Sequence, residues 1–195
     1  LIGGAGTDSL EFAGNDVAPD TLTLSDAQVH YLPGGFIKHL TGIERAKITG
    51  GAGANQYDAS AFTGPVSMIG DGAGDTLLGG TAQDTISGGL GNDRIAGGPG
   101  NDTLDGGPAN DTLAQSGDAD HTLHSDGIVT GEGIASPGAF ENASVTGGAS
   151  DNRLDATEYP MPVTLGGGGG DDGDHPAPGG AETAQRLAAG LVRDR

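Results

Sequence analysis

The stretch from Gly70 to Ala114 reads, in blocks of nine residues, GDGAGDTLL, GGTAQDTIS, GGLGNDRIA, GGPGNDTLD and GGPANDTLA. The sixth place of every block holds an aspartate, and these are Asp75, Asp84, Asp93, Asp102 and Asp111. The eighth place always holds a branched aliphatic residue, and glycine crowds places one to four. Five unbroken periods with two fixed places indicate a repeated structural unit, because a flexible acidic segment has no reason to repeat an aliphatic residue.

Each block has the composition of a tight turn followed by a short strand. Glycine takes positive φ without steric cost, so the first places allow a turn whose carbonyls point inward. The three residues after the aspartate suffice for a short strand, in which only the aliphatic side chain faces inward. Two blocks then make a coil of 18 residues, and stacked coils make two parallel sheets. We expect Leu77, Ile95 and Leu113 on one sheet with Ile86 and Leu104 on the other, and Asp75, Asp93 and Asp111 along one side with Asp84 and Asp102 along the opposite side.

The pattern resembles the nonapeptide G-G-x-G-x-D-x-U-x of RTX, or hemolysin-type, calcium-binding proteins. The resemblance implies a parallel β-roll with Ca²⁺ held between the turns of successive coils. Calcium takes about six to eight oxygen ligands from carboxylates and backbone carbonyls, which such turns offer. The expected metal ligands are Asp75, Asp84, Asp93, Asp102, Asp111, Asp8, Gly88, Gly89, Gly91, Gly97, Gly98 and Gly100.

Alanine replaces glycine in three of the turns. It stands at place four in Ala73, Ala82 and Ala109, and a non-glycine residue in a left-handed conformation costs roughly 1 kcal/mol. The blocks 88–96 and 97–105 keep every mark of the motif. The turns that contain Asp84, Asp93 and Asp102 are therefore the best candidate sites.

The nine-residue rhythm is irregular before the central stretch. Gly3–Glu11 carries every mark, with Asp8 at place six, but between residues 20 and 48 the rhythm stops and four short strands are expected, at 21–24, 28–32, 36–40 and 43–48. We interpret this section as an elaborated coil of the same stack without metal turns. Gly50–Asp58 restores the frame with Asn55 in place of aspartate, which predicts a structural turn rather than a calcium site.

A longer repeat overlies the short one. Ile43–Gly51 corresponds to Phe140–Gly148, an offset of 97 residues, and the match continues through GGAGANQYDAS against GGASDNRLDAT. The chain therefore looks like two copies of a larger module. Phe62, Val66 and Met68 lead into the central blocks and are expected to cap their hydrophobic interior.

These observations predict an all-β protein, a parallel β-roll or β-helix solenoid with an irregular N-terminal strand section. The expected sections are an N-terminal β section (1–69), a calcium-binding core of five nonapeptides (70–114), a degenerate second copy (115–174) and a tail (175–195). Ala184, Leu187, Ala188 and Leu191 recur at helical spacing, so a short C-terminal helix that caps the roll is one interpretation of the tail. A secretion tail, unrelated terminal sequence and a disordered tail are the alternatives.

Composition favours a protein that interacts with cations. The 195 residues carry a formal charge of −19, include 40 glycines, and contain no cysteine or tryptophan. This charge repels nucleic acid and anionic lipid and makes bound cations the natural partner. No run of about 18 apolar residues exists, so no membrane insertion is expected. The absence of an initiator methionine and of a basic-then-apolar leader suggests a mature product or a piece of a longer parent chain with other domains.

No catalytic motif accompanies the repeats. The sequence lacks H-E-x-x-H, G-x-S-x-G, a P-loop, and a G-x-G-x-x-G placed between a strand and a helix. We therefore expect no enzymatic activity, with a fragment of a polysaccharide lyase or epimerase as the alternative. Such parallel β-helix enzymes carry basic residues near the cleavage site, and this chain has only 8 lysines and arginines.

The expected function is that of a secreted, extracellular or cell-surface module that folds on binding Ca²⁺ and supports an attached activity. One aliphatic residue per block gives the roll a thin interior, and apposed aspartates repel one another without a counterion. Metal binding would therefore supply folding energy. An adhesin that uses the flat side of the roll against a glycan, a surface layer or ice is the alternative, suggested by Thr76, Thr85, Thr103 and Thr112 at place seven and weakened by Arg94 among them.

Overall fold

The computed structural model describes residues 1–14, 18–32, 35–118, 121–123, 129–130, 133–138, 140–170 and 173–175, the backbone alone for 129–130, 133–138 and 173–175. The described part forms nineteen strands and contains no helix. The strands are β1 (Ser9–Ala13), β2 (Thr21–Ser25), β3 (Gln28–Leu32), β4 (Phe36–His39), β5 (Arg45–Thr49), β6 (Gln56–Ala61), β7 (Val66–Asp71), β8 (Thr76–Leu78), β9 (Thr85–Gly89), β10 (Arg94–Ala96), β11 (Gly100–Asp105), β12 (Thr112–Ser116), β13 (His121–Leu123), β14 (Val129–Thr130), β15 (Gly133–Gly138), β16 (Asn142–Thr146), β17 (Arg153–Asp155), β18 (Val163–Gly166) and β19 (Gly173–His175). The predicted all-β class is confirmed.

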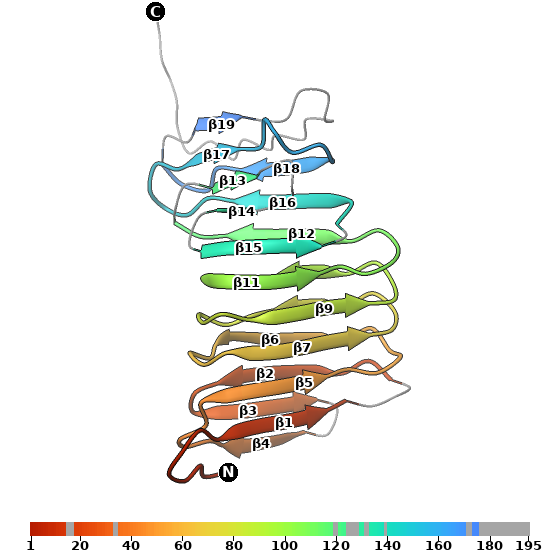
Figure 1. Cartoon of the computed structure of the whole chain (residues 1–195), viewed down its shortest axis with the longest axis vertical. Helices are drawn as coiled ribbons and strands as arrows, with labels where there is room; N and C mark the ends of the chain where they lie inside the picture. The colour runs from red at the N-terminus through yellow and green to blue at the C-terminus, as the bar shows by residue number, and fades with distance from the viewer. Residues whose placement is uncertain are drawn as a thin grey trace, which may run out of the picture.

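The strands stack along one long axis and form two sheets that both run the length of the stack (Figure 1). One sheet has ten strands in the order β1-β5-β7-β9-β11-β15-β14-β13-β17-β19, and the other has nine in the order β18-β16-β12-β10-β8-β6-β2-β3-β4. From β5 to β12 the chain alternates between the sheets, so each strand pairs in parallel with the strand two places along the sequence. This is the predicted parallel roll.

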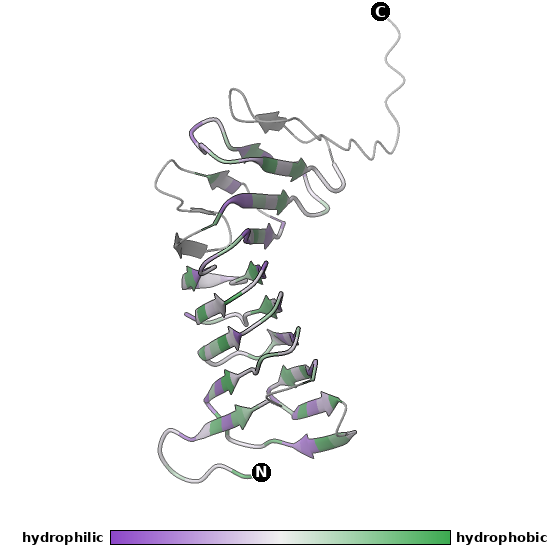
Figure 2. Cartoon of the chain, turned by 90° about the vertical axis from the view of Figure 1, so that its right-hand side faces the viewer, coloured by the Kyte–Doolittle hydropathy of each residue, from purple (hydrophilic) through white to green (hydrophobic). Residues whose placement is uncertain are grey.

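The aliphatic places meet in register inside the roll. Ile95 lies opposite both Leu77 and Leu113 in the nine-stranded sheet, and Leu104 lies opposite Ile86 in the ten-stranded sheet. None of these five side chains is more than 1% exposed. Along the strands hydrophobic and hydrophilic residues alternate (Figure 2), as the two-residue period of a strand requires. The two rows predicted from the repeat are confirmed.

The interior extends well beyond the central blocks. One hydrophobic cluster continues from Leu10 near the N-terminus to Leu165 in the second copy. The prediction that Phe62, Val66 and Met68 cap the interior is wrong, because further buried layers lie on both sides of these residues. They are buried members of a longer core.

The irregular N-terminal section forms an antiparallel meander on the stack. β2 pairs in parallel with β6 and so continues the nine-stranded sheet, while β3 and β4 fold back against it in antiparallel order. All four strands expected between residues 21 and 48 are present within a few residues of the predicted bounds. The interpretation as an elaborated coil of the same stack is confirmed.

The offset of 97 residues is also structural. β5, β6 and β7 begin at residues 45, 56 and 66, and β16, β17 and β18 begin at 142, 153 and 163. Equivalent strands of the two copies lie in opposite sheets: β5 and β7 are in the ten-stranded sheet, whereas β16 and β18 are in the nine-stranded sheet. The chain between the copies therefore passes from one sheet to the other an odd number of times. The second copy also has a meander, β13-β14-β15, on the opposite sheet from the first.

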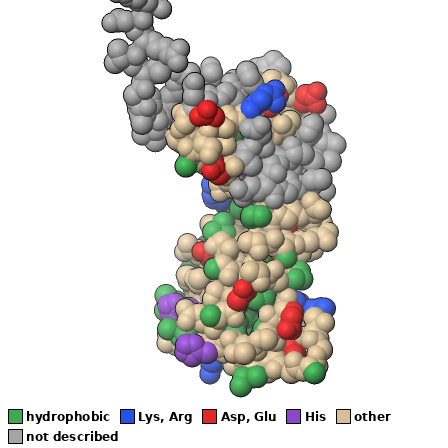
Figure 3. Space-filling model, turned by 90° about the vertical axis from the view of Figure 1, so that its left-hand side faces the viewer, with side chains coloured by type: hydrophobic (Ala, Val, Ile, Leu, Met, Phe, Trp, Pro, Cys, Tyr) green, Lys and Arg blue, Asp and Glu red, His purple; other side chains and the backbone are tan. Residues whose placement is uncertain are grey.

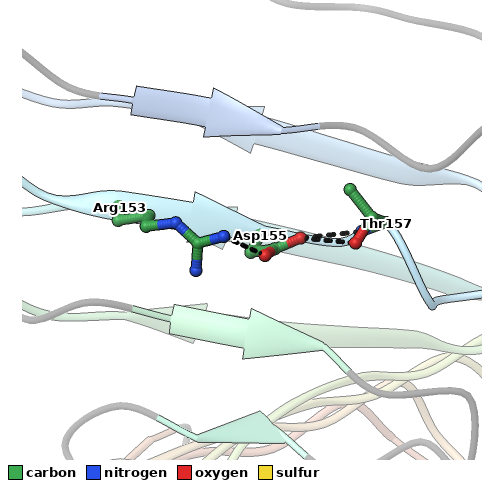
Figure 4. A network of polar contacts seen from close by, with 3 residues as sticks. All are labelled: Arg153, Asp155 and Thr157. Atoms are coloured by element: carbon green, nitrogen blue, oxygen red, sulfur yellow. Dashed lines mark hydrogen bonds and ion pairs between the residues drawn. The ribbon is translucent and has the colours of Figure 1, made fainter.

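A small polar turn repeats with the copies. Asp58 Oδ1 accepts hydrogen bonds from the backbone N–H and the hydroxyl of Ser60, and Asp155 Oδ1 accepts the same two bonds from Thr157. Asp155 also pairs with Arg153 through its other oxygen (Figure 4). The preserved turn shows that the two copies share local geometry.

The predicted C-terminal helix cannot be compared with the structure. The helical spacing at 184–191 lies outside the described residues, as does most of the tail. Within the described residues, no helix is long and apolar enough to cross a membrane.

The buried rows make a simple prediction about stability. Leu104→Ala should lower the free energy of unfolding, measured in calcium-containing buffer, by about 2–5 kcal/mol, because the deletion leaves a cavity between the sheets. Leu90→Ala is the matched control, since Leu90 is 63% exposed and should change stability by less than about 0.5 kcal/mol. Equal losses in denaturant titrations of the two variants would contradict the observed packing.

Candidate metal centre

Each aspartate of the repeat stands where a turn enters a strand. Asp75, Asp84, Asp93 and Asp111 directly precede β8, β9, β10 and β12, and Asp102 lies within β11. All five are buried, at 0–3% exposure. On one turn-lined side of the stack, neutral surface accordingly predominates over acidic groups in the described part (Figure 3).

Hydrogen bonds join these aspartates into columns. The Asp75 N–H donates to Asp93 Oδ1 at 2.7 Å, and the Asp93 N–H donates to Asp111 Oδ1 at 2.8 Å. On the opposite side the Asp84 N–H donates to Asp102 Oδ1 at 2.9 Å. The two columns have the membership predicted from the coil of 18 residues. In each of these acceptors, one carboxylate oxygen therefore joins two successive coils by a hydrogen bond to the backbone.

The second carboxylate oxygen is left without a partner in four cases. Oδ2 is buried and makes no hydrogen bond in Asp75, Asp93, Asp102 and Asp111. Asp84 differs, because the Gly80 N–H donates to its Oδ2 at 2.6 Å. An isolated buried charge is strongly unfavourable unless it is neutralised or paired. These oxygens therefore mark places where a cation or a proton is required.

A backbone carbonyl lies near two of these oxygens, those of Asp75 and Asp93. A Cβ added at Gly70 would lie 2.2 Å from Asp75 Oδ2 and 2.5 Å from the Gly88 carbonyl oxygen. A Cβ at Gly88 would lie 2.2 Å from Asp93 Oδ2 and 2.6 Å from the Gly106 carbonyl oxygen. A carboxylate and a carbonyl oxygen of the next coil thus share one small space, and neither brings a hydrogen. An oxygen-lined space of this kind suits a hard cation such as Ca²⁺.

The turn glycines are required for two different reasons. Gly89, Gly91, Gly98 and Gly100 have φ values of +102°, +118°, +87° and +143°, a region that L side chains rarely adopt. Gly88 and Gly97 do not, but a Cβ there would approach Asp93 or Asp102 Oδ2 to within 2.3 Å. All six glycines predicted as ligand-turn positions therefore shape the turns around the buried carboxylates.

The alanines at place four behave in two ways. Ala73 and Ala109 have φ of +63° and +110°, so the expected left-handed strain is present in those two turns. Ala82 is not among the residues with positive φ. Its turn avoids the strained conformation, and the prediction of strain at this position is wrong.

Asp8 occupies a related but more exposed turn. Its Oδ2 accepts a hydrogen bond from the Gly4 N–H at 2.5 Å, as Asp84 Oδ2 does from Gly80. Its own N–H donates to Glu44 Oε2 at 2.8 Å rather than to another aspartate. The structure therefore places Asp8 against the loop that contains Glu44.

Sequence reasoning missed two glutamates that accept hydrogen bonds from the backbone of repeat aspartates. The Asp111 N–H donates to Glu141 Oε2 at 2.7 Å, as the Asp8 N–H donates to Glu44. Glu44 and Glu141 stand at equivalent places of the long repeat. That equivalence was the available signal, although the nine-residue period gave no reason to connect either residue with an aspartate.

Burial changes the acidity of the column aspartates. Desolvation raises the pKa of Asp75 to about 7, and the nearby charge of Asp93 adds to the effect. Desolvation raises the pKa of Asp102 to about 6. The pKa values of Asp84, Asp93 and Asp111 are also raised, chiefly by burial. Without a metal, these carboxyls therefore take up protons at a higher pH than an exposed aspartate does.

The donor set is carboxylate plus carbonyl. Among the described residues, no group of three or more histidine, cysteine, aspartate or glutamate side chains converges on one point. A cation in these turns would be held by the aspartates together with backbone oxygens, which is the oxygen-only chemistry that Ca²⁺ prefers. Bound Ca²⁺ would neutralise the carboxylates and join successive turns.

Comparison with known families agrees with this geometry. Residues 69–104, 78–113 and 87–120 match the model of the RTX calcium-binding nonapeptide repeat, a model that spans four copies. No significant match is found to a curated protein or to a solved structure. The parallel stack and the matched repeats support a calcium-binding β-roll repeat module in this part of the chain. The match covers residues 69 to 120, so the similarity to RTX calcium-binding nonapeptide repeats is confined to this segment.

The raised pKa values predict competition between protons and Ca²⁺. Below pH 7 the protonated carboxyls must release protons before metal binds, so the half-saturating calcium concentration should be several-fold higher at pH 5.5 than at pH 7.5. A raised folded-state pKa favours the metal-free fold below the unfolded value and loses that contribution as the pH rises through about 7. Acidification in a chelator should therefore increase β structure.

Circular dichroism during calcium titrations at the two pH values measures both effects. An unchanged half-saturation point, or a loss of metal-free β structure between pH 7.5 and 5.5, would contradict the assignment of the raised pKa values to the column aspartates.

Proposed function

We propose that this chain is a secreted structural module of a larger extracellular protein, and that it folds as it binds Ca²⁺. The observation that carries the proposal is the row of buried, unpartnered Oδ2 atoms beside carbonyl oxygens. A structural role fits a chain whose recognisable chemistry is confined to its turns. We propose no catalytic activity for it.

The proposed ligands come from both sides of the roll. Asp75, Asp93 and Asp111 supply carboxylates along one side, and Asp84 and Asp102 along the other. Turn carbonyls in the segments that contain Gly88, Gly89, Gly91, Gly97, Gly98 and Gly100 complete the oxygen shell. Asp8 is proposed for a separate, more exposed position near the N-terminus.

Calcium-dependent folding follows from the charge of the chain. The formal net charge is −19, and five carboxylates must be buried in the turns. Because the unfolded chain has no preformed site, the free energy of binding contributes directly to folding. Affinities of about 10⁻⁴–10⁻³ M, typical of extracellular modules, would make the fold depend on calcium levels outside the cell. Secretion as an unfolded chain and folding on arrival would then be coupled to the calcium gradient.

A second candidate function uses the outer face of the ten-stranded sheet. Ser67, Thr85 and Thr103 lie in register on neighbouring strands, and all three side chains are exposed. A row of hydroxyls on a flat face suits adhesion to a glycan or another surface. Binding to a glycan array in the presence of calcium would be the signature of this role.

Removal of calcium tests the proposed function. Addition of EGTA to the folded chain should abolish most of the β signal in far-UV circular dichroism, because the buried carboxylates lose their counterions. Excess Ca²⁺ should restore the signal, whereas the same concentration of Mg²⁺ should not, since Mg²⁺ demands near-octahedral geometry and dehydrates reluctantly. A β spectrum that is unaffected by EGTA at neutral pH would refute calcium-dependent folding.

A further inference from the structure

Asn55 occupies the position of a column aspartate. It stands at place six of Gly50–Asp58 and is 3% exposed. Its Oδ1 accepts a hydrogen bond from the Asp20 N–H at 3.1 Å, and its own N–H donates to Asp75 Oδ1 at 2.7 Å. These are the same two bonds that connect the aspartates of the column. Asn55 therefore extends the column by one coil.

The second atom of the side chain behaves differently. Asn55 Nδ2 donates to the Gly51 carbonyl at 3.3 Å and to the Gly70 carbonyl at 3.2 Å. Gly51 belongs to the same turn as Asn55, and Gly70 lies near the end of β7, where the next coil begins. The amide thus joins two successive turns through their carbonyl oxygens, which is the task that a cation would perform.

The amide nitrogen and the orphan carboxylate oxygen lie at matching places. A Cβ at Gly50 would lie 2.6 Å from Asn55 Nδ2 and 2.2 Å from the Gly70 carbonyl oxygen. At Gly70 the corresponding distances are 2.2 Å to Asp75 Oδ2 and 2.5 Å to the Gly88 carbonyl oxygen. The surroundings are the same, and only the identity of the side-chain atom differs.

We propose that Asn55 replaces a bound cation with its own amide hydrogens, and that aspartate at this position would create an additional calcium site. Asparagine and aspartate have nearly the same shape, but the amide is neutral and carries two donors, whereas the carboxylate is charged and only accepts. One atom therefore decides whether this turn needs a metal. The inference rests on the proposed function, because it presumes that the aspartate turns hold Ca²⁺.

The turn that contains Asn55 lies next to the largest buried apolar side chains of the stack. Tyr57 and Phe62 follow it directly and are fully buried, together with Leu22 and Leu24 of the neighbouring strand. This part of the stack has a larger apolar core than the central blocks, which contribute one aliphatic residue per nonapeptide. A metal-free turn here gives the calcium-dependent coils a neighbour that needs no ion for its own closure.

A reciprocal exchange in the full chain tests the inference. Bound calcium is counted by native mass spectrometry, and calcium-dependent folding is followed by circular dichroism. Asn55→Asp should bind one ion more than the unsubstituted chain and require more calcium for folding. Asp75→Asn should bind one ion fewer and fold at a lower calcium concentration. Gln56→Glu is the matched control, because it adds the same charge at an exposed neighbouring position and should leave the ion count unchanged.

The outcomes separate this inference from the proposed function. An unsubstituted chain that binds no calcium would overturn the proposed function and the inference with it. A calcium-binding chain whose folded Asn55→Asp variant gains no ion would overturn the inference alone. If Asn55→Asp does not fold at any calcium concentration, Asp75→Asn decides: loss of one ion with a lower folding midpoint supports the inference, and an unchanged ion count overturns it.

Discussion

The structure depends on the close approach of carboxylate and carbonyl oxygens inside its turns. In the turns of Asp75 and Asp93, one buried carboxylate oxygen accepts a hydrogen bond from a backbone N–H, and the other has no hydrogen-bond partner and lies near a carbonyl of the next coil. In a low-dielectric environment this arrangement is unfavourable until a positive charge enters. Under the proposed function, the stacking of the coils and the binding of a cation are therefore coupled.

The apolar interior and the charged turns differ in importance along the axis of the stack. The central blocks give one aliphatic residue per strand, and their turns carry the buried charge. The N-terminal section has aromatic and larger aliphatic residues, antiparallel strands and the amide-closed turn of Asn55. Under the proposed function, apolar burial stabilises mainly the N-terminal section, and metal coordination would stabilise the central blocks.

The repeat made the aspartate columns and the aliphatic rows predictable, because a fixed nine-residue period determines which residues meet one coil later. The roles of Glu44 and Glu141 did not follow from the nine-residue period, since both lie in loops outside it, and only the longer repeat relates them. The opposite placement of β5 and β16 depends on the number of crossings between them, which an insertion such as the β13-β15 meander obscures. The continuity of the core past Phe62 was missed because residues 1–48 contribute their apolar side chains without the regular spacing.

The central claim is that a cation, held by aspartate and carbonyl oxygens, neutralises the buried carboxylates of the turns. Anomalous diffraction from crystals grown in calcium tests it most directly. The account predicts a calcium peak in contact with Asp93 Oδ2 and the Gly106 carbonyl oxygen, and equivalent peaks along both columns. An ordered turn at Asp93 in which a proton or a water molecule, rather than a metal, joins these two oxygens would contradict it.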